Sequence, residues 1–131
     1  MNNLSRWAPL VLSLLRIITG LLFLEHGTMK LFDFPIAQPG APDSLPPLLM
    51  TAAILELVGG ALITLGLFTR PVAFILSGQM AVAYFMAHAP RGFWPAVNQG
   101  ETAILYCFIF FYLVFAGPGS ISADAMFRKR A

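Results

Sequence analysis

The chain has 131 residues, of which 58% are hydrophobic and only 11% are charged, and its formal net charge is +2. An ordinary soluble domain is about 25% charged, and a small core cannot hide so much apolar side chain, so a soluble domain is excluded. The small net charge and the lack of a basic stripe argue against a nucleic-acid partner. The composition indicates an integral membrane protein of one domain, residues 1–131, surrounded by the lipid bilayer.

Four apolar segments predict an all-α membrane protein. They cover residues 8–27, 48–68, 71–87 and 101–116. Each approaches the length that crosses about 30 Å of hydrocarbon, and helices are required because backbone groups in lipid must bond within their own segment. Arg16 interrupts the first apolar run and no small-x-small cleavage site follows it, so we expect a retained helix and not a signal peptide.

The connections predict that both termini lie on one side of the membrane. A Pro- and Gly-rich first loop covers residues 28–47, a tight turn covers 68–71, and a third loop covers 88–100. The termini and the tight turn hold five Lys and Arg residues against two in the long loops, and these residues favour the cytoplasmic side. We therefore expect a four-transmembrane-helix antiparallel bundle with both termini in the cytoplasm.

Three polar residues interrupt the apolar segments at similar expected depths. With a rise of 1.5 Å per residue, Arg16 and Gln79 lie roughly 12 Å, and Glu56 about 16 Å, from the cytoplasmic helix ends. Small residues surround Arg16 and Glu56 on their helical faces, which indicates helix–helix contact, and we predict a salt bridge between the two. An unpaired charge at this depth costs at least about 2.5–3.5 kcal/mol. The pair is either a structural clamp or a site for a polar headgroup, a proton or a quinone carbonyl.

A second polar cluster is expected at the outer ends of the helices. Its members are Glu25, His26, Lys30, His88, Arg91 and Glu101. His26 and Lys30 share a helical face, whereas Glu25 points away from the side of Arg16. Asn98 and Glu101 also form a capping-box pattern, which competes with a site role for Glu101. The candidate ligand-binding residues of the whole chain are Arg16, His26, Lys30, Glu56, Gln79 and Glu101.

Metal and thiol chemistry have little support in the sequence. His26 and His88 do not occur in an HxxxH, HxH or ExxH pattern, so no metal site is predicted. Cys107 is the single cysteine and lies inside an apolar run, so it cannot form an intrachain disulfide. We therefore expect no side chain of this protein to carry electrons, and no catalytic residue can be named.

Three stretches of the sequence resemble the DoxX family. They are LLRIITGLLFLEHGTMKLF at 14–32, ILELVGGALITLGLFTRPVA at 54–73 and NQGETAILYCFIFFYLVFAGPGSISAD at 98–124. The resemblance implies a four-helix protein of the bacterial inner membrane that is associated with membrane redox chemistry. The motif residues that carry it are Arg16, His26, Lys30, Glu56, Arg70, Glu101 and Asp124.

The polar layer and the resemblance together indicate a subunit of a quinone-linked redox system. Charged groups beside aromatic side chains suit a carbonyl headgroup with an apolar tail, so quinone is the expected cofactor. A soluble or membrane redox partner protein is also expected, because the chain has no electron carrier of its own. A small-molecule transporter and a membrane scaffold for a redox complex stay open as alternatives, and the sequence does not decide whether the protein is a homo-oligomer.

Overall fold

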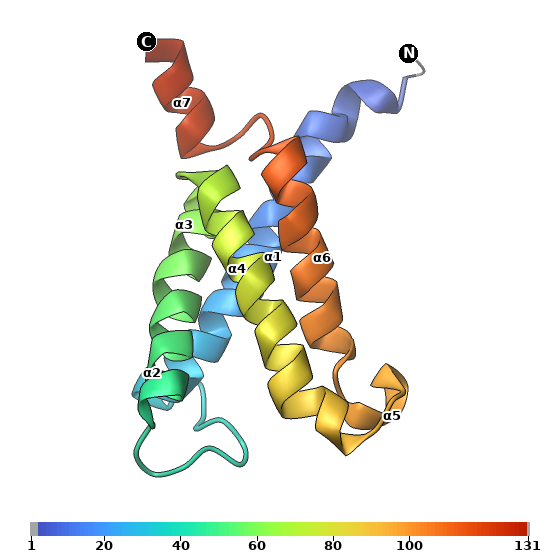
Figure 1. The fold of residues 1–131 in the computed structure, drawn as a ribbon. Helices are drawn as coiled ribbons and strands as arrows, with labels where there is room; N and C mark the ends of the chain where they lie inside the picture. Colours follow the sequence, from blue (N-terminus) through green and yellow to red (C-terminus); the bar gives the residue numbers. More distant parts are fainter. Residues whose placement is uncertain (1–2, 131) are drawn as a thin grey trace.

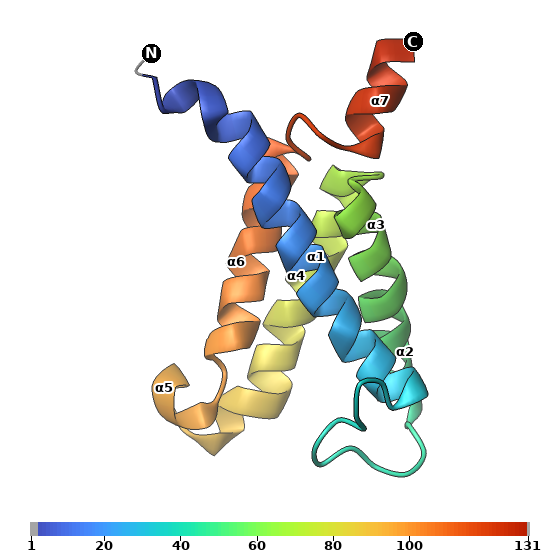
Figure 2. The same ribbon diagram turned by 180° about the vertical axis from the view of Figure 1, so that it is seen from behind.

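The computed structural model describes residues 3–130, and every regular element in this part of the chain is a helix. Both ends of the chain lie on one side of the molecule, which we call the terminal end (Figures 1 and 2). The connection 33–46 and the short helix α5 (Pro95–Asn98) lie on the opposite side, which we call the loop end (Figure 1). The chain passes between these two ends four times, so consecutive passes are antiparallel.

Helix α1 (Ala8–Phe32) forms the first pass and follows a short 3-10 turn, η1 (Ser5–Trp7). Pro9 is tolerated in its first turn, where an N–H has no intrahelical partner. The helix stops at Asp33, whose φ of 53° and ψ of 35° are left-handed. It is five residues longer than the predicted segment 8–27, so Lys30 lies on a helix and not in a loop.

The second pass is a continuous rod made of three elements. These are α2 (Pro47–Ile54), the π-helix η2 (Leu55–Gly59) and α3 (Gly60–Leu65). Proline at the first helical position starts the rod without losing a backbone bond. Gly66 ends it with a φ of 70°, a left-handed conformation that glycine adopts without a Cβ clash.

The third pass ends in irregular turns at the loop end, and the fourth is a regular α-helix. The third consists of α4 (Thr69–Ala83), the π-helix η3 (Tyr84–His88) and the 3-10 turn η4 (Ala89–Arg91). The fourth is α6 (Glu101–Ala116), and after the connection 117–122 the chain ends in α7 (Ala123–Arg130). Unlike the passes, α7 is polar, which agrees with a position outside the hydrocarbon layer.

Within residues 3–130, three helical stretches are long and apolar enough to cross a membrane. They cover 28, 19 and 23 residues, ending at Phe32, Leu65 and Arg91. Helix α6 has 16 residues and is about 24 Å long. Large hydrophobic side chains are exposed on every pass, as expected for a surface that faces lipid. These findings agree with an all-α membrane protein, while the four-helix bundle and the cytoplasmic termini stay predictions.

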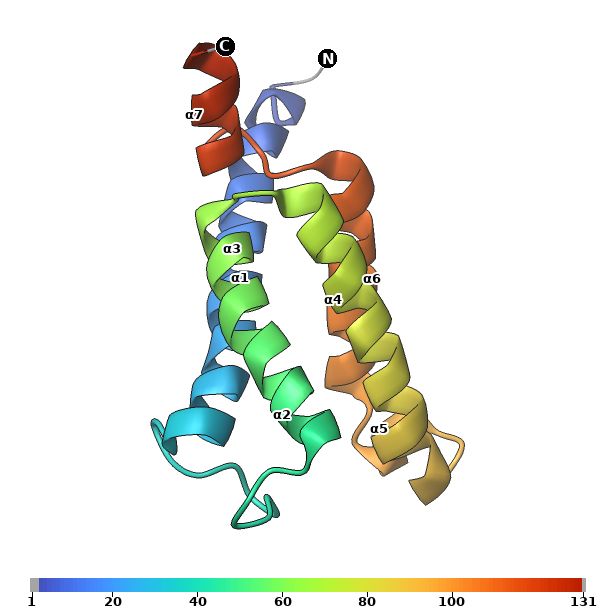
Figure 3. The same cartoon turned by 60° about the vertical axis from the view of Figure 1, so that its left-hand side comes forward.

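The passes pack as two pairs, α1 against α2–η2–α3 and α4 against α6 (Figure 3). Phe23 of α1 joins the pairs, because its ring meets those of Tyr106 and Phe110 on α6 edge-on, with centroids 5.3 and 5.0 Å apart. The same buried cluster includes Ile63, Ala73, Leu76, Met80 and Leu113. This core joins the two pairs, and its members Phe23, Met80 and Tyr106 border a space that opens between the pairs towards the loop end.

Helix α1 and the second pass approach each other closely at glycine positions. A Cβ on Gly27 would lie 2.7 Å from the backbone nitrogen of Leu57, and one on Gly60 would lie 2.8 Å from Cα of Leu24. Gly78 on α4 is different, because a Cβ there would meet nothing within 4 Å. Small residues thus set the distance between the two helices of the first pair, as is common in lipid.

We expect Gly27→Ala to lower the free energy of unfolding by about 1–3 kcal/mol, because the added methyl group forces two helix backbones apart. Unfolding in a mild detergent, followed by circular dichroism, measures the change. Gly78→Ala is the matched control and should be neutral or stabilising by up to about 1 kcal/mol, since alanine favours helix. Equal losses in the two variants would contradict the close approach at Gly27.

Candidate functional site

A cavity of about 880 Å³ lies between the two helix pairs at the loop end. Small-molecule sites usually have volumes of about 300–1,000 Å³. Most of its wall is apolar, and the lining residues come from all four passes and from the connection 33–46. Its polar and charged side chains include His26, Lys30, Glu56, Gln79, His88, Arg91 and Tyr106. Four of the six candidate ligand-binding residues therefore line one cavity.

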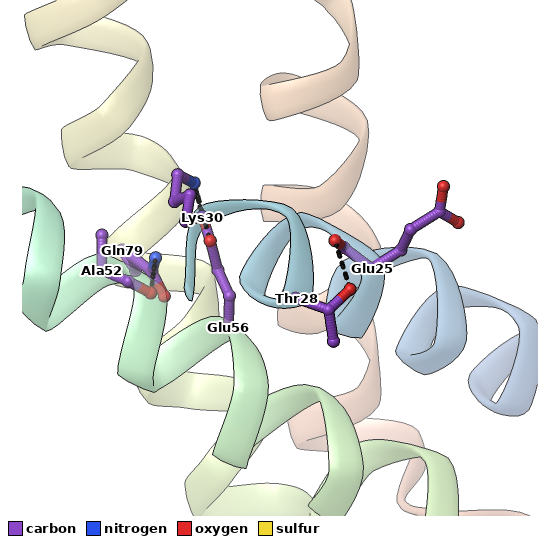
Figure 4. Close-up of polar contacts among 6 residues, drawn as sticks. All are labelled: Glu25, Thr28, Lys30, Ala52, Glu56 and Gln79. Carbon is purple, nitrogen blue, oxygen red and sulfur yellow. Dashed lines mark hydrogen bonds and ion pairs between the residues drawn. The ribbon is translucent and has the colours of Figure 1, made fainter. Parts of the chain in front are cut away.

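Lys30 and Glu56 form an ion pair in the cavity wall. Lys30 Nζ donates to Oε1 and Oε2 of Glu56 at 2.7 and 2.6 Å, and the two side chains are 11% and 6% exposed. Figure 4 shows Lys30 reaching Glu56, whereas Glu25 points away from the pair and is exposed. An ammonium group has three N–H donors, so one stays available beyond the two bonds to Glu56. Among residues 3–129, no other Lys or Arg side chain has a carboxylate partner.

Gln79 of α4 contacts the second pass across the cavity. Its Nε2 donates to the carbonyl of Ala52 at 3.4 Å, while its Oε1 is buried without a hydrogen-bond partner (Figure 4). A buried acceptor without a donor costs about 1–3 kcal/mol, so a donor group placed there by a ligand or water would be favourable. Glu56 itself belongs to the π-helix η2, and π turns within helices are rare and frequent at functional sites.

Aromatic and imidazole rings complete the polar part of the wall. The ring of His26 stands edge-on to that of Tyr106, with centroids 6.1 Å apart. His88 on η3 approaches the carbonyl oxygen of Asn98 through Nδ1 at 3.1 Å. A carbonyl can only accept, so Nδ1 carries the proton and Nε2 of a neutral His88 is an acceptor. The cavity therefore offers both donors and acceptors to a ligand.

Arg16 lies at the terminal end and does not line this cavity. Its guanidinium donates to three backbone carbonyls, those of Pro118, Ile121 at 2.9 Å and Thr64 at 3.3 Å. Ser13 adds to the same contact by accepting the N–H of Ile121 at 3.0 Å. Arg16 therefore fastens the connection 117–122 to α1 and α3.

The predicted salt bridge between Arg16 and Glu56 is wrong, and so is the common layer with Gln79. Helical Cα–Cβ bonds tilt towards the N-terminus of their own helix. In antiparallel passes, Arg16 leans towards the terminal end and Glu56 towards the loop end, whereas Lys30 leans back from the loop end towards Glu56. The packing register separates the two residues as well, because Gly20 lies against Thr64 and Gly27 against Leu57, so Arg16 is nearer the terminal end than Glu56.

Two further motif residues hold the terminal end together. The carboxylate of Asp124 accepts the N–H groups of Phe68 and Thr69 at 2.9 and 3.0 Å, which caps the start of α4. Arg70 donates through Nη1 to two carbonyls in the last turn of α6, at 2.9 and 2.7 Å. Both residues thus have a structural explanation and lie far along the chain from the groups that they cap.

Glu101 is exposed at the first position of α6 and does not line the cavity. The N-cap of α6 is Gly100 and no side chain caps the helix, so the predicted capping box with Asn98 is wrong. Asn98 is buried instead, and it accepts the N–H of Gly100 at 2.8 Å and donates to the carbonyl of Gly92 at 2.9 Å. Asn98 shapes the connection before α6 rather than the helix itself.

Two residues of the cavity wall, Tyr106 and Gly78, were not predicted from the sequence. Tyr106 lies four residues before Phe110 on the buried face of α6, and this helical spacing is the signal that could have identified it. Gly78 lies inside α4, and a Cβ added there would meet no other atom within 4 Å, so helix packing does not require a glycine at this position. An isolated glycine in a helical pattern is the feature of the sequence that could have drawn attention to it. Gly78 widens the cavity that Lys30 and Glu56 face, and Tyr106 adds a polar group to its wall.

Cys107 and the histidines do not gather into a cluster. Among the residues that the structure describes, no group of three or more His, Cys, Asp or Glu could hold a metal ion. Cys107 lies between α4 and α6, where its carbonyl accepts a hydrogen bond from Ser77 Oγ at 2.8 Å. Its Sγ is 3.5 Å from the same hydroxyl.

Comparisons with known proteins identify the family. The DoxX family model matches residues 11–89, which is more than half of the chain and includes the ion pair. An uncharacterized protein of Haemophilus influenzae is 46% identical over 134 residues, covering 99% of this chain and 100% of that protein. An uncharacterized membrane protein of Mycobacterium tuberculosis is 28% identical over 132 residues, covering 89% and 81%. No solved structure matches. The chain belongs to the DoxX family of membrane proteins.

Proposed function

We propose that this protein binds the headgroup of a quinone-class amphiphile in the loop-end cavity, as a subunit of a quinone-linked redox system in the bacterial inner membrane. The observation that carries the proposal is the buried Lys30–Glu56 pair, which faces a cavity of about 880 Å³ beside the unpaired Oε1 of Gln79. Apolar residues of similar volume would hold the helices together at least as well as a buried ion pair. Ionisable groups retained at membrane depth therefore point to a ligand.

The donors in the wall suit a carbonyl headgroup. Lys30 keeps one N–H beyond its bonds to Glu56, and the imidazole of His26 offers a second donor on the same helix. Two quinone carbonyls need two such donors. Gln79 Oε1 and Nε2 of a neutral His88 are acceptors for the hydroxyl groups of the reduced form.

The apolar wall suits the tail of such a molecule. Ile75 and Val82 of α4 and Met86 of η3 line the cavity and are also exposed on the surface of the molecule. A prenyl or alkyl chain bound along them would continue into the lipid around the protein. The cavity therefore offers a polar interior and an apolar exit, which is the arrangement that an amphiphile requires.

Electrons are expected to come from a partner protein. The chain has one cysteine, which rules out an intrachain dithiol–disulfide cycle. A soluble or membrane partner that carries a flavin or metal would supply the electrons, while this subunit would hold and orient the quinone. His26, Lys30 and His88 would then fix the headgroup and exchange protons with it.

The proposed topology has four membrane crossings with both termini in the cytoplasm. Arg6, Arg70, Arg128 and Lys129 all belong to the terminal end, and basic residues favour the cytoplasmic face. Helix α6, about 24 Å long, crosses the hydrocarbon only together with the residues that flank it. The loop-end cavity would then open near the outer leaflet.

Gly78→Leu is expected to reduce quinone binding at least about tenfold, because the new side chain occupies the cavity, where a Cβ at this position has no other atom within 4 Å. The measurement is equilibrium binding of a benzoquinone with a decyl tail to the purified protein in lipid nanodiscs. Ala96→Leu places a leucine at an exposed position outside the cavity, and the variant should bind like the unmodified protein.

Decanol provides the headgroup control, since it has the tail without the carbonyls. Saturable binding of the benzoquinone but not of decanol supports the proposal. If neither a benzoquinone nor a naphthoquinone binds saturably, or if Gly78→Leu binds either as well as Ala96→Leu does, the proposed site is wrong.

A proton-coupled transporter is the second candidate, because Glu56 is a carboxylate that faces a cavity inside the helices. Glu56 is less suited to the role of a proton carrier because both of its carboxylate oxygens accept hydrogen bonds from Lys30. Uptake of a solute into sealed vesicles that depends on a proton gradient and disappears in Glu56→Gln would favour the transporter over the quinone subunit.

A further inference from the structure

A second cavity of about 540 Å³ lies at the terminal end, between the start of α1 and the end of α6. It shares no lining residue with the loop-end cavity. We infer that it binds the phosphate headgroup of an anionic phospholipid. Four features carry the inference: two unpaired arginines, the scarcity of acidic groups, an apolar wall and a position at the edge of the hydrocarbon layer.

Arg70 and Arg128 supply the positive charge. Both line the cavity, one from the start of α4 and one from α7. Arg70 uses Nη1 to bond the last turn of α6, and its Nη2 lies against the backbone of Gly117, because a Cβ there would be 3.0 Å from that atom. Arg128 is exposed and, among residues 3–129, neither arginine has a carboxylate partner.

The terminal end has almost no competing negative charge. Asp124 is the only one of the six acidic residues of the chain that belongs to this end. Both of its carboxylate oxygens already accept backbone N–H groups, at 2.9 and 3.0 Å. Among the described residues no carboxylate neutralises the two arginines of the cavity, so their positive charges can attract a phosphate group.

The apolar wall favours a lipid over a soluble phosphate. Pro9 and Leu12 of α1 face Tyr112 of α6 across the cavity. Beyond the cavity, exposed apolar side chains continue towards the middle of the passes, with Leu15 on α1 and Phe108 on α6. An acyl chain can lie along these side chains while its phosphate stays near the arginines.

The cavity lies at the level where headgroups are expected. Tyr112 is about 6 Å from the end of α6, and Trp7 is exposed just before α1. Tyr and Trp mark the interface between hydrocarbon and water, and basic pockets between helices at this level bind anionic headgroups.

Native mass spectrometry of the full chain in a lipid-free detergent, titrated with phosphatidylglycerol or phosphatidylcholine, tests the inference. Phosphatidylglycerol should be retained at least about fivefold more than phosphatidylcholine, and Arg128→Gln should reduce its retention about fivefold. Lys129→Gln removes the same charge from the neighbouring position on α7, which does not line the cavity, and should change retention less than about twofold. Ala116→Leu fills the cavity without a change of charge and should also reduce retention.

Three results would overturn the inference. Equal losses in Arg128→Gln and Lys129→Gln would show attraction by surface charge alone. Unchanged retention in Ala116→Leu, with the variant folded by circular dichroism, would place the lipid elsewhere. Inorganic phosphate that displaces phosphatidylglycerol at millimolar concentration would identify a soluble phosphate as the ligand. None of these results bears on quinone binding, which Arg128→Gln should leave unchanged.

Discussion

Lys30→Met is expected to lower the free energy of unfolding by about 3–5 kcal/mol, because it leaves the carboxylate of Glu56 buried without a partner. The double variant Lys30→Met with Glu56→Met should recover most of this loss, since two apolar side chains of similar volume replace the pair. Unfolding in mild detergent gives the stabilities. Binding of the decyl benzoquinone gives the function, and we expect it to be lost in both variants.

The double variant separates a structural clamp from a ligand site. A clamp predicts that binding returns together with stability, whereas a site predicts recovered stability without binding. Lys129→Met is the matched control, because it removes an exposed lysine and should change stability by less than about 0.5 kcal/mol. Full stability of the single variant Lys30→Met would contradict the buried ion pair itself.

Arg16→Met should cost at least about 3 kcal/mol, because three backbone carbonyls lose a charged donor. Arg16→Lys keeps the charge but not the planar fork, so we expect an intermediate loss. Hydrogen exchange locates the effect. The amides of Ile121 and Asp124, which bond to Ser13 Oγ and to the carbonyl of Gly66, should lose protection before those of α4 and α6.

Arg6→Gln is the control for this substitution, since Arg6 is exposed at the same end and its guanidinium lies over the Trp7 ring. It should leave both stability and amide protection unchanged. Quinone binding should persist in Arg16→Lys, because Arg16 does not line the loop-end cavity. Loss of binding in a stable Arg16→Lys variant would place Arg16 in the site after all.

The helical faces could be read from the sequence because they depend on local periodicity. The 100° step places Gly20, Phe23, Gly27 and Lys30 on the side of Arg16. The first three are buried in α1, and the side chain of Lys30 is only 11% exposed. The exposed position of Glu25 follows from the same 100° step. The end of α1 at Asp33 was harder to predict, because the Gly27 that suggested a helix end serves a close contact with Leu57 instead.

The π-helices had no signature in the sequence. The hydrophobic pattern of residues 48–68 is that of one α-helix. In η2, around Glu56, each helical turn is one residue longer than in an α-helix. Such a change depends on how the rod packs against its neighbours and not on the type of residue. The cavity could not be predicted from the sequence either, because it results from the separation of the two helix pairs.

The sequence by itself determined that the protein is an all-α membrane protein, which side of α1 faces inward, and that polar residues interrupt the passes. These properties follow from composition and from the helical repeat, which are local. Only the tertiary structure decided that Glu56 pairs with Lys30 and that Arg16 binds the connection 117–122. The physical reason is that α1 packs with Gly20 against Thr64 and Gly27 against Leu57, which places Arg16 and Glu56 at different depths. The direction in which each side chain leaves its helix separates the two charges further.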